Sequence, residues 1–109
     1  MSNRCCPQFH CAVELVGKRW SGAILAVLLA ADQPLRFSEL AAAVPQLHDR
    51  LLSERLKELE AAGVVVRRTD PDQPRRVEYE LTRMGRELAP ALHELRAWAQ
   101  RWRVADRVA

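Results

Sequence analysis

The sequence predicts a mainly α-helical fold that carries one small β-hairpin, an α+β arrangement. Two short amphipathic helical patterns follow each other within residues 37–62. A β-branched run at residues 64–66 comes directly after them and is typical of a strand. A turn with two prolines and two aspartates then leads into the alternating segment 77–81, which indicates a half-buried second strand. A helix pair followed by a basic hairpin, here residues 37–81, is the layout of a winged helix-turn-helix.

Length and composition favour one domain over residues 1–109. Hydrophobic residues make up 49% of the 109 residues, which is enough for a core in a domain of this size. The longest apolar stretch, residues 23–31, is shorter than the roughly 20 residues that a membrane-spanning helix needs. The N-terminus has no apolar signal core. We therefore expect a cytoplasmic protein with no membrane partner.

The N-terminal third is expected to hold a loose tail and two helices. Residues 1–9 are expected to be a loose tail in which Pro7 prevents an early helix. A short helical pattern begins at residues 11–16, and a strongly apolar helix follows over residues 21–31. Asp32-Gln33-Pro34 is expected to end the second of these helices.

The helix-turn-helix is delimited by capping residues. Ser38 is expected to cap a helix over residues 39–44, because its hydroxyl can accept from the orphan amides of the first turn. A second helix is expected from about residue 48 to residue 62, with its cap at His48 or Asp49. Leucines at spacings of four and three, at positions 52, 56 and 59, predict its buried face.

The second helix is the candidate recognition element, because this helix of the motif enters the major groove with its N-terminal residues nearest the bases. Arg50 can offer a bidentate fork to guanine, and Glu54 can accept from cytosine N4. Alternatively, Arg50 and Glu54 pair with each other as i, i+4 neighbours on a solvated surface. The residues of the helix pair that are expected to contact DNA are Ser38, His48, Asp49, Arg50, Ser53, Glu54 and Lys57.

Four arginines flank the hairpin turn, although the net charge of the chain is only +3. Two are expected to end one strand and two to begin the next, so that a tight hairpin gathers four cations and favours contact with phosphates. The alternative is a solvated turn in which Asp70 and Asp72 neutralise part of this charge. The expected phosphate contacts are Arg67, Arg68, Arg75 and Arg76.

The C-terminal region, residues 82–103, is expected to be a dimerisation helix region that Thr82 caps. Pro90 either kinks this helix or divides it. Its apolar stripe has too many large groups for one face of a terminal helix in a small monomer. The stripe could instead close the monomer's own core. We expect both, with the first turns packed inward and Trp98 and Trp102 against a partner.

No arrangement of residues indicates an enzyme. The chain has no glycine-rich phosphate loop, no pair of carboxylates placed for acid–base work, and no Ser-His-Asp set. His10 and Cys11 are adjacent, and adjacent side chains on a helix point apart. We expect no catalysis and no cofactor. The alternative to DNA binding is an interaction module whose basic hairpin binds an acidic protein.

Several segments together resemble the HxlR-type transcriptional regulators, which are small winged-helix proteins of bacteria. The resemblance covers residues 11–98 through CAVELVGKRW, FSEL, LSERLKELEAAGVVVRR, VEYELTRMGREL and ALHELRAWA. It implies a homodimer, expected to act as a repressor, on a pseudo-palindromic operator, with a recognition helix at residues 48–62 and a wing at residues 67–76. The chain departs from the family pattern at Ala12 and at His48-Asp49. The implied interface between the N- and C-terminal helices contains Val13, Val16, Leu92, Leu95, Trp98 and Trp102.

The three cysteines are the candidate sensing residues. Cys11 matches the cysteine that some HxlR-type regulators use as a thiol switch, and it is expected near a helix start with Lys18 close by. The alternative is that Cys11 is a small buried hydrophobic residue. Cys5 and Cys6 are either resolving thiols or uninvolved. Cys6, His10 and Cys11 could also supply three metal ligands, but no fourth ligand is near, so no metal site is expected.

Overall fold

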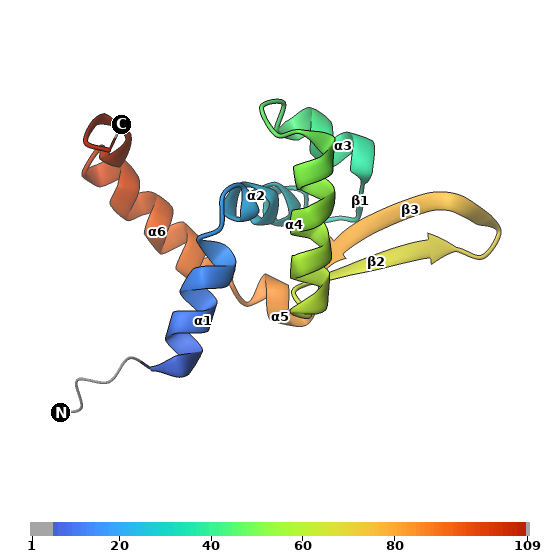
Figure 1. Ribbon diagram of the computed structural model, residues 1–109, viewed down its shortest axis with the longest axis horizontal. Helices are drawn as coiled ribbons and strands as arrows, with labels where there is room; N and C mark the ends of the chain where they lie inside the picture. Colours follow the sequence, from blue (N-terminus) through green and yellow to red (C-terminus); the bar gives the residue numbers. More distant parts are fainter. Residues whose placement is uncertain (1–5, 109) are drawn as a thin grey trace.

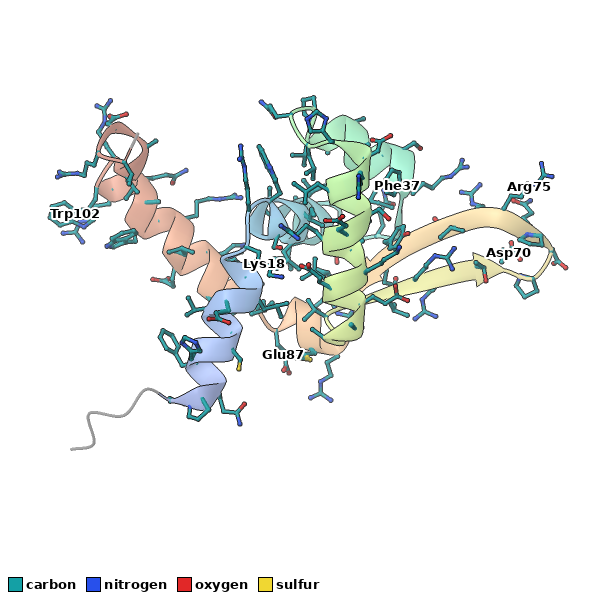
Figure 2. The ribbon with its side chains drawn as sticks, viewed as in Figure 1. Lys18, Phe37, Asp70, Arg75, Glu87 and Trp102 are labelled. Atoms are coloured by element: carbon teal, nitrogen blue, oxygen red, sulfur yellow. The ribbon has the colours of Figure 1, made fainter. Side chains whose placement is uncertain are left out.

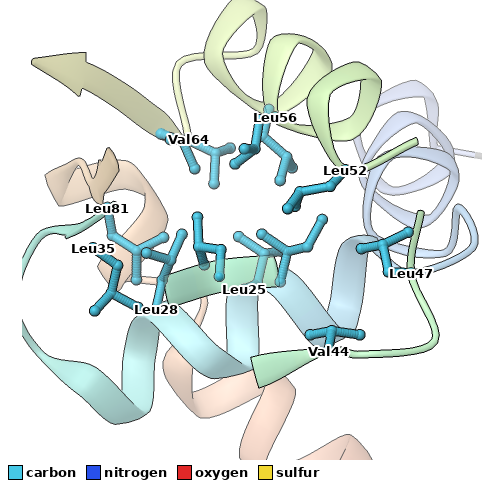
Figure 3. Close-up of a cluster of buried hydrophobic side chains, with 13 residues drawn as sticks. Leu25, Leu28, Leu35, Val44, Leu47, Leu52, Leu56, Val64 and Leu81 are labelled. Carbon is cyan, nitrogen blue, oxygen red and sulfur yellow. The ribbon is translucent and has the colours of Figure 1, made fainter. Parts of the chain in front are cut away.

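Three helices surround the hydrophobic core of the computed structural model, which describes residues 6–108 (Figure 1). They are α2 (Ser21–Ala31), α3 (Phe37–Ala43) and α4 (Asp49–Ala61). Leucines from all three helices and valines from the strand that follows α4 fill the space between them (Figure 3). Gly63, with a φ of 83°, ends the recognition helix in the left-handed conformation that favours glycine. The predicted winged helix-turn-helix layout is confirmed.

A three-stranded antiparallel sheet follows the helix pair, with strand order β1-β3-β2. Its strands are β1 (Leu35–Arg36), β2 (Val65–Asp70) and β3 (Gln73–Leu81). Val65 lies opposite Leu81 at the buried base of the sheet. Both hairpin strands are longer than predicted, and the turn shrinks to residues 71–72. Residues 67–70 of β2 and residues 73–76 of β3 are exposed, and no hydrophobic alternation marks these ends of the strands.

The first helix, α1 (Pro7–Val16), begins four residues earlier than the sequence predicted. Pro7 does not prevent the helix; it occupies the first turn, where a missing amide hydrogen costs nothing. The expected loose tail is therefore wrong for the described residues before position 10. No residue of α1 is buried, and only Leu15 and Val16 pack against the core.

Helix α3 has a different cap from the one predicted. Its N-cap is Arg36, and the Glu39 carboxylate accepts from the Arg36 amide at 2.8 Å. Ser38 lies inside the first turn and is exposed. Helix α3 begins at Phe37, one residue before Ser38, and Phe37 packs partly against the core. The expectation that Ser38 is the N-cap is wrong because the glutamate at the third position satisfies the orphan amide instead.

The C-terminal region contains two helices, since Pro90 divides it. They are α5 (Arg83–Arg86) and α6 (Ala89–Arg101), followed by the short 3-10 helix η1 (Val104–Asp106). Thr82 caps α5 as predicted, because its hydroxyl accepts from the Gly85 amide at 3.1 Å. The hairpin projects from one side of the core, while α1 and α6 extend from the other, and the longest dimension is 55 Å (Figure 1). Within residues 6–108, no helix has the length and hydrophobicity to cross a membrane.

Candidate nucleic-acid interface

Helix α4 packs one face into the core and presents the other to solvent. Leu52, Leu56 and Leu59 are buried, as their spacing predicted (Figure 3). On the opposite face, the Arg50 side chain is 93% exposed. The residues expected to contact DNA thus differ in access: His48, Asp49, Arg50, Glu54 and Lys57 are exposed, and Ser53 is half-buried.

Arg50 and Glu54 form the ion pair that the sequence left open as an alternative. The Arg50 Nε and Glu54 Oε1 atoms are 3.7 Å apart, which is too long for a good hydrogen bond. Both side chains are more than half exposed, and exposed pairs of this kind contribute about 0–1 kcal/mol. Arg50 can therefore exchange Glu54 for a base or a phosphate at little cost.

The N-terminus of α4 carries a charge pattern of its own. His48 is the N-cap, but its side chain accepts no capping hydrogen bond. Asp49 lies in the first turn, where its negative charge complements the helix dipole. The same charge opposes a nearby phosphate, so Asp49 is better suited to a base edge than to the DNA backbone.

Two of the four wing arginines pair with glutamates of the hairpin. Arg68 Nε donates to Glu80 Oε1 at 2.7 Å, and Arg76 Nε lies 3.8 Å from Glu78 Oε1. The partners are thus glutamates of β3 rather than the aspartates of the turn. Asp70 instead accepts the Asp72 amide and shapes the turn. The alternation of β3, which is visible in the sequence, places Glu78 and Glu80 on the same face of the sheet as Arg68 and Arg76.

Two wing arginines remain without a counter-ion. No carboxylate among residues 6–108 pairs with Arg67 or Arg75. Arg67 lies opposite Tyr79, on the face of the sheet that also carries the buried Val65 and Leu81. Arg68 lies on the other face. Arg75 lies near the tip of the wing, in the irregular stretch of β3 (Figure 2). Among residues 6–108, Arg67 and Arg75 are therefore the wing arginines whose guanidinium groups make no ion pair.

Large apolar side chains are exposed at the end of the molecule opposite the wing. Leu88, the N-cap of α6, and Leu92 on α6 pack against the monomer's own core, as Val16 of α1 does. Trp98 is 55% exposed, and two guanidinium groups flank the Trp102 ring at 5.6 and 6.0 Å from its centre. The stripe therefore divides as expected, with its first turns inward and its later turns outward. The exposed large apolar side chains of α1, of α6 and of the C-cap of α6, together named the apolar face below, are Phe9, Val13, Leu95, Trp98 and Trp102.

The N-terminal thiols lie on or next to α1. Cys11 is exposed, so the alternative of a buried hydrophobic cysteine is wrong. It is in the second turn, not at the helix start, and Lys18 binds Glu58 instead of approaching it. Cys6 is the exposed N-cap of α1, while Cys5 lies outside the described residues. His10 pairs with Glu14 at 2.9 Å, and no metal-binding cluster of three occurs among residues 6–108.

Comparison with known proteins assigns this arrangement to a family. The model of the HxlR-like helix-turn-helix family matches residues 15–107, which include α2 to α6 and the wing. The chain belongs to the HxlR-like family. It is therefore a transcriptional regulator of the HxlR type, and the sequence resemblance is confirmed.

Individual HxlR-like relatives are similar over most of the chain. An uncharacterised HTH-type regulator, YvaP of Bacillus subtilis, is 52% identical over 97 residues, covering 89% of this chain and 88% of YvaP. The reduced form of the B. subtilis regulator YodB has a TM-score of 0.78 at 40% identity, covering 88% of this chain and 92% of that one. The redox regulator HypR in its reduced form has a TM-score of 0.82 at 29% identity, covering 94% and 99%. YodB is also known in a quinone-bound and a diamide-treated form.

Phe9 is the member of the apolar face that was not predicted from the sequence. It lies on α1 four residues before Val13 and is 67% exposed. The expectation of a loose tail concealed this spacing. The frequent occurrence of proline in the first turn of helices was the signal that could have revealed it.

Proposed function

We propose that this HxlR-type regulator acts as a homodimer that reads a pseudo-palindromic operator with α4 and grips the DNA backbone with its wing. The observation that carries the proposal is the wing itself, where Arg67 and Arg75 have no counter-ion among residues 6–108. Two such cations beside an exposed recognition helix are an electrostatic footprint for phosphates. The protein would act in the cytoplasm, where its DNA lies.

The exposed apolar face supports the homodimer. Its aromatic and aliphatic side chains lie on α1 and α6, away from the wing and the recognition helix (Figure 1). A second copy covering this face would remove it from water and leave both recognition helices accessible. Two-fold symmetry would then place the helices about 34 Å apart, one turn of DNA.

A mobility-shift assay with the DNA upstream of the protein's own gene tests the proposal. We expect tight binding to an imperfect inverted repeat in that DNA and much weaker binding to a random duplex of equal length. Equal affinity for the two duplexes would contradict sequence-specific regulation. Binding to neither duplex, together with capture of acidic polypeptides, would favour a protein-interaction module.

Replacing Arg67 with alanine is expected to weaken binding to all duplexes alike. The variant loses one phosphate contact, so the slope of log affinity against log salt should fall by about 1. Titration of a labelled operator at several salt concentrations measures the slope. Arg68→Ala is the matched control, because it removes the same formal charge from a side chain already bound to Glu80. Identical slopes for the Arg67→Ala and Arg68→Ala variants would show that Arg67 makes no phosphate contact beyond any made by Arg68.

We further propose that Cys11 is a thiol switch. Its thiol is exposed on α1, two residues from Phe9 and from Val13, and so on roughly the opposite side of the helix from these two apolar side chains. On meeting a quinone, the sulfur would bond to a ring carbon. The thiol proton and the displaced ring hydrogen would become the two phenolic hydrogens of a hydroquinone. An aromatic group attached there would add bulk to α1, the helix that also carries Phe9 and Val13 of the proposed interface. YodB with bound quinone and HypR in oxidised and reduced forms support this chemistry in relatives.

Cys11→Ser is expected to abolish the response of DNA binding to quinone while leaving the affinity of the untreated protein unchanged. The serine keeps the size and exposure of the side chain but cannot add to the quinone. Operator affinity is measured with and without quinone, and mass spectrometry reports the adduct. Cys6→Ser, at another exposed thiol, is the control and should respond like the native protein. If Cys11→Ser still releases DNA on treatment, the switch lies elsewhere.

A further inference from the structure

Two segments that resemble the family, GKRW at residues 17–20 and the second half of α4, meet on a flank of the recognition helix. The Arg55 side chain is 16% exposed, and its Nε donates to the Arg19 carbonyl at 3.0 Å. Its Nη1 donates to Glu58 Oε1 at 3.1 Å, and Lys18 Nζ donates to the same oxygen at 3.1 Å. These bonds connect the link between α1 and α2 to the recognition helix. None of them involves the exposed face that is proposed to read DNA.

The linking backbone is held in an unusual conformation. Trp20 has a φ of 76°, which is costly for a large side chain and persists only where the surroundings hold it. At Gly17 a Cβ atom would lie 2.6 Å from the Val13 carbonyl oxygen, so the backbone conformation at the end of α1 leaves no space for a side chain at position 17. The carbonyl that Arg55 binds belongs to Arg19, the residue next to Trp20.

The direction of α1 depends on this link. No residue of α1 is buried, and only its last residues, Leu15 and Val16, pack against the core. Residues 17–20 are then the remaining connection between α1 and the rest of the described chain. Helix α1 carries Cys11 and part of the apolar face, so whatever fixes the link also fixes these groups relative to α4.

We infer that Arg55 is a positioning residue that couples the direction of α1 to the recognition helix; this inference rests on the proposed function. Two side-chain contacts join the link to α4: Lys18 with Glu58, and Arg55 with the Arg19 carbonyl. The Lys18–Glu58 pair is the weaker, because Lys18 is about half exposed and solvent screens its charge. The Arg55 guanidinium is largely buried and makes two charge-assisted hydrogen bonds: one joins α4 to the Arg19 carbonyl in the link, and the other holds the side chain to Glu58 of its own helix. A change at the α1 face, from dimerisation or from a modified Cys11, therefore reaches α4 through Arg55.

Arg55→Lys in the full-length protein tests the coupling, because lysine keeps the charge beside Glu58 but cannot form both bonds at once. Arg83→Lys is the matched control, at an exposed i, i+4 pair that joins no two elements. We measure amide hydrogen exchange across residues 6–62, thermal unfolding, and affinity for the operator. The expected result for Arg55→Lys is faster exchange in residues 17–20 and α1, and a loss of operator affinity of roughly 2- to 30-fold. The unfolding midpoint should stay near that of the control.

Exchange and affinity equal to those of Arg83→Lys would overturn the inference. A large fall in the unfolding midpoint alone would also overturn it, since it would mark a purely structural residue. Glu58→Gln then provides a second variant: it keeps the Arg55 bond to Arg19 and should show a smaller effect in the same direction. If the native protein itself binds no operator, the proposed function fails, while the exchange measurement still decides whether Arg55 holds α1.

Discussion

Trp98→Glu is expected to convert the protein into monomers and to weaken operator binding by about 30-fold or more, because loss of an interface hot spot costs about 2 kcal/mol or more. The indole is more than half exposed in the monomer, so the substitution should leave the fold intact. In the dimer it would place a carboxylate among apolar side chains without a partner. Sedimentation at low micromolar concentration measures assembly, and titration with the operator measures binding.

The control for this substitution adds the same charge to the same helix at a different angle. Gln100→Glu lies two residues further along α6, roughly 200° around the helix axis from Trp98, and is exposed. It should remain dimeric and bind the operator normally. A dimeric Trp98→Glu variant with native affinity would show that α6 does not form the interface. A monomeric variant with native affinity would show that one copy is enough to read the DNA.

Gly85→Ala is expected to lower the free energy of unfolding by about 1–3 kcal/mol, the usual range for overpacking a core. In an ordinary helix this change stabilises by up to about 1 kcal/mol, so the surroundings decide the sign. Here a Cβ atom would lie 2.3 Å from the Val64 carbonyl oxygen, which also accepts from the Thr82 amide. The backbone cannot move away without breaking the junction of α4, β2 and α5. Urea denaturation at one protomer concentration measures the change.

Gly22→Ala in α2 is the matched control, because the nearest atom to its Cβ would be the Val16 carbonyl oxygen at 3.8 Å, an ordinary contact. This variant should be neutral or slightly more stable than the native protein. If both glycine variants have the same stability, the close contact at Gly85 is relieved by a small shift of α5, and the packing argument is wrong.

Local patterns in the sequence predicted the central elements of this fold. Leu52, Leu56 and Leu59 repeat at helical spacing, so the buried face of α4 follows from periodicity alone. Gly63 and Thr82 are recognisable at helix boundaries, because each satisfies a requirement of the backbone next to it. The errors at Pro7 and Ser38 have a common origin. Each prediction rested on a general preference of one residue type, proline before a helix and serine at the N-cap. In the structure both residues lie inside the first turn of their helix.

Other properties were decided only by the tertiary structure. The alternation of the hairpin is visible in the sequence, but the register determines that Glu80 neutralises Arg68 and leaves Arg67 available. The apolar stripe of α6 is equally visible, but the packing against α2 decides where it turns from core to exposed face. Arg55 binds the Arg19 carbonyl only because the fold brings residues 17–20 against α4. Sequence alone determined which groups each element carries, because those signals are local. Which charges are paired and which surfaces stay open depends on contacts between residues distant in the chain.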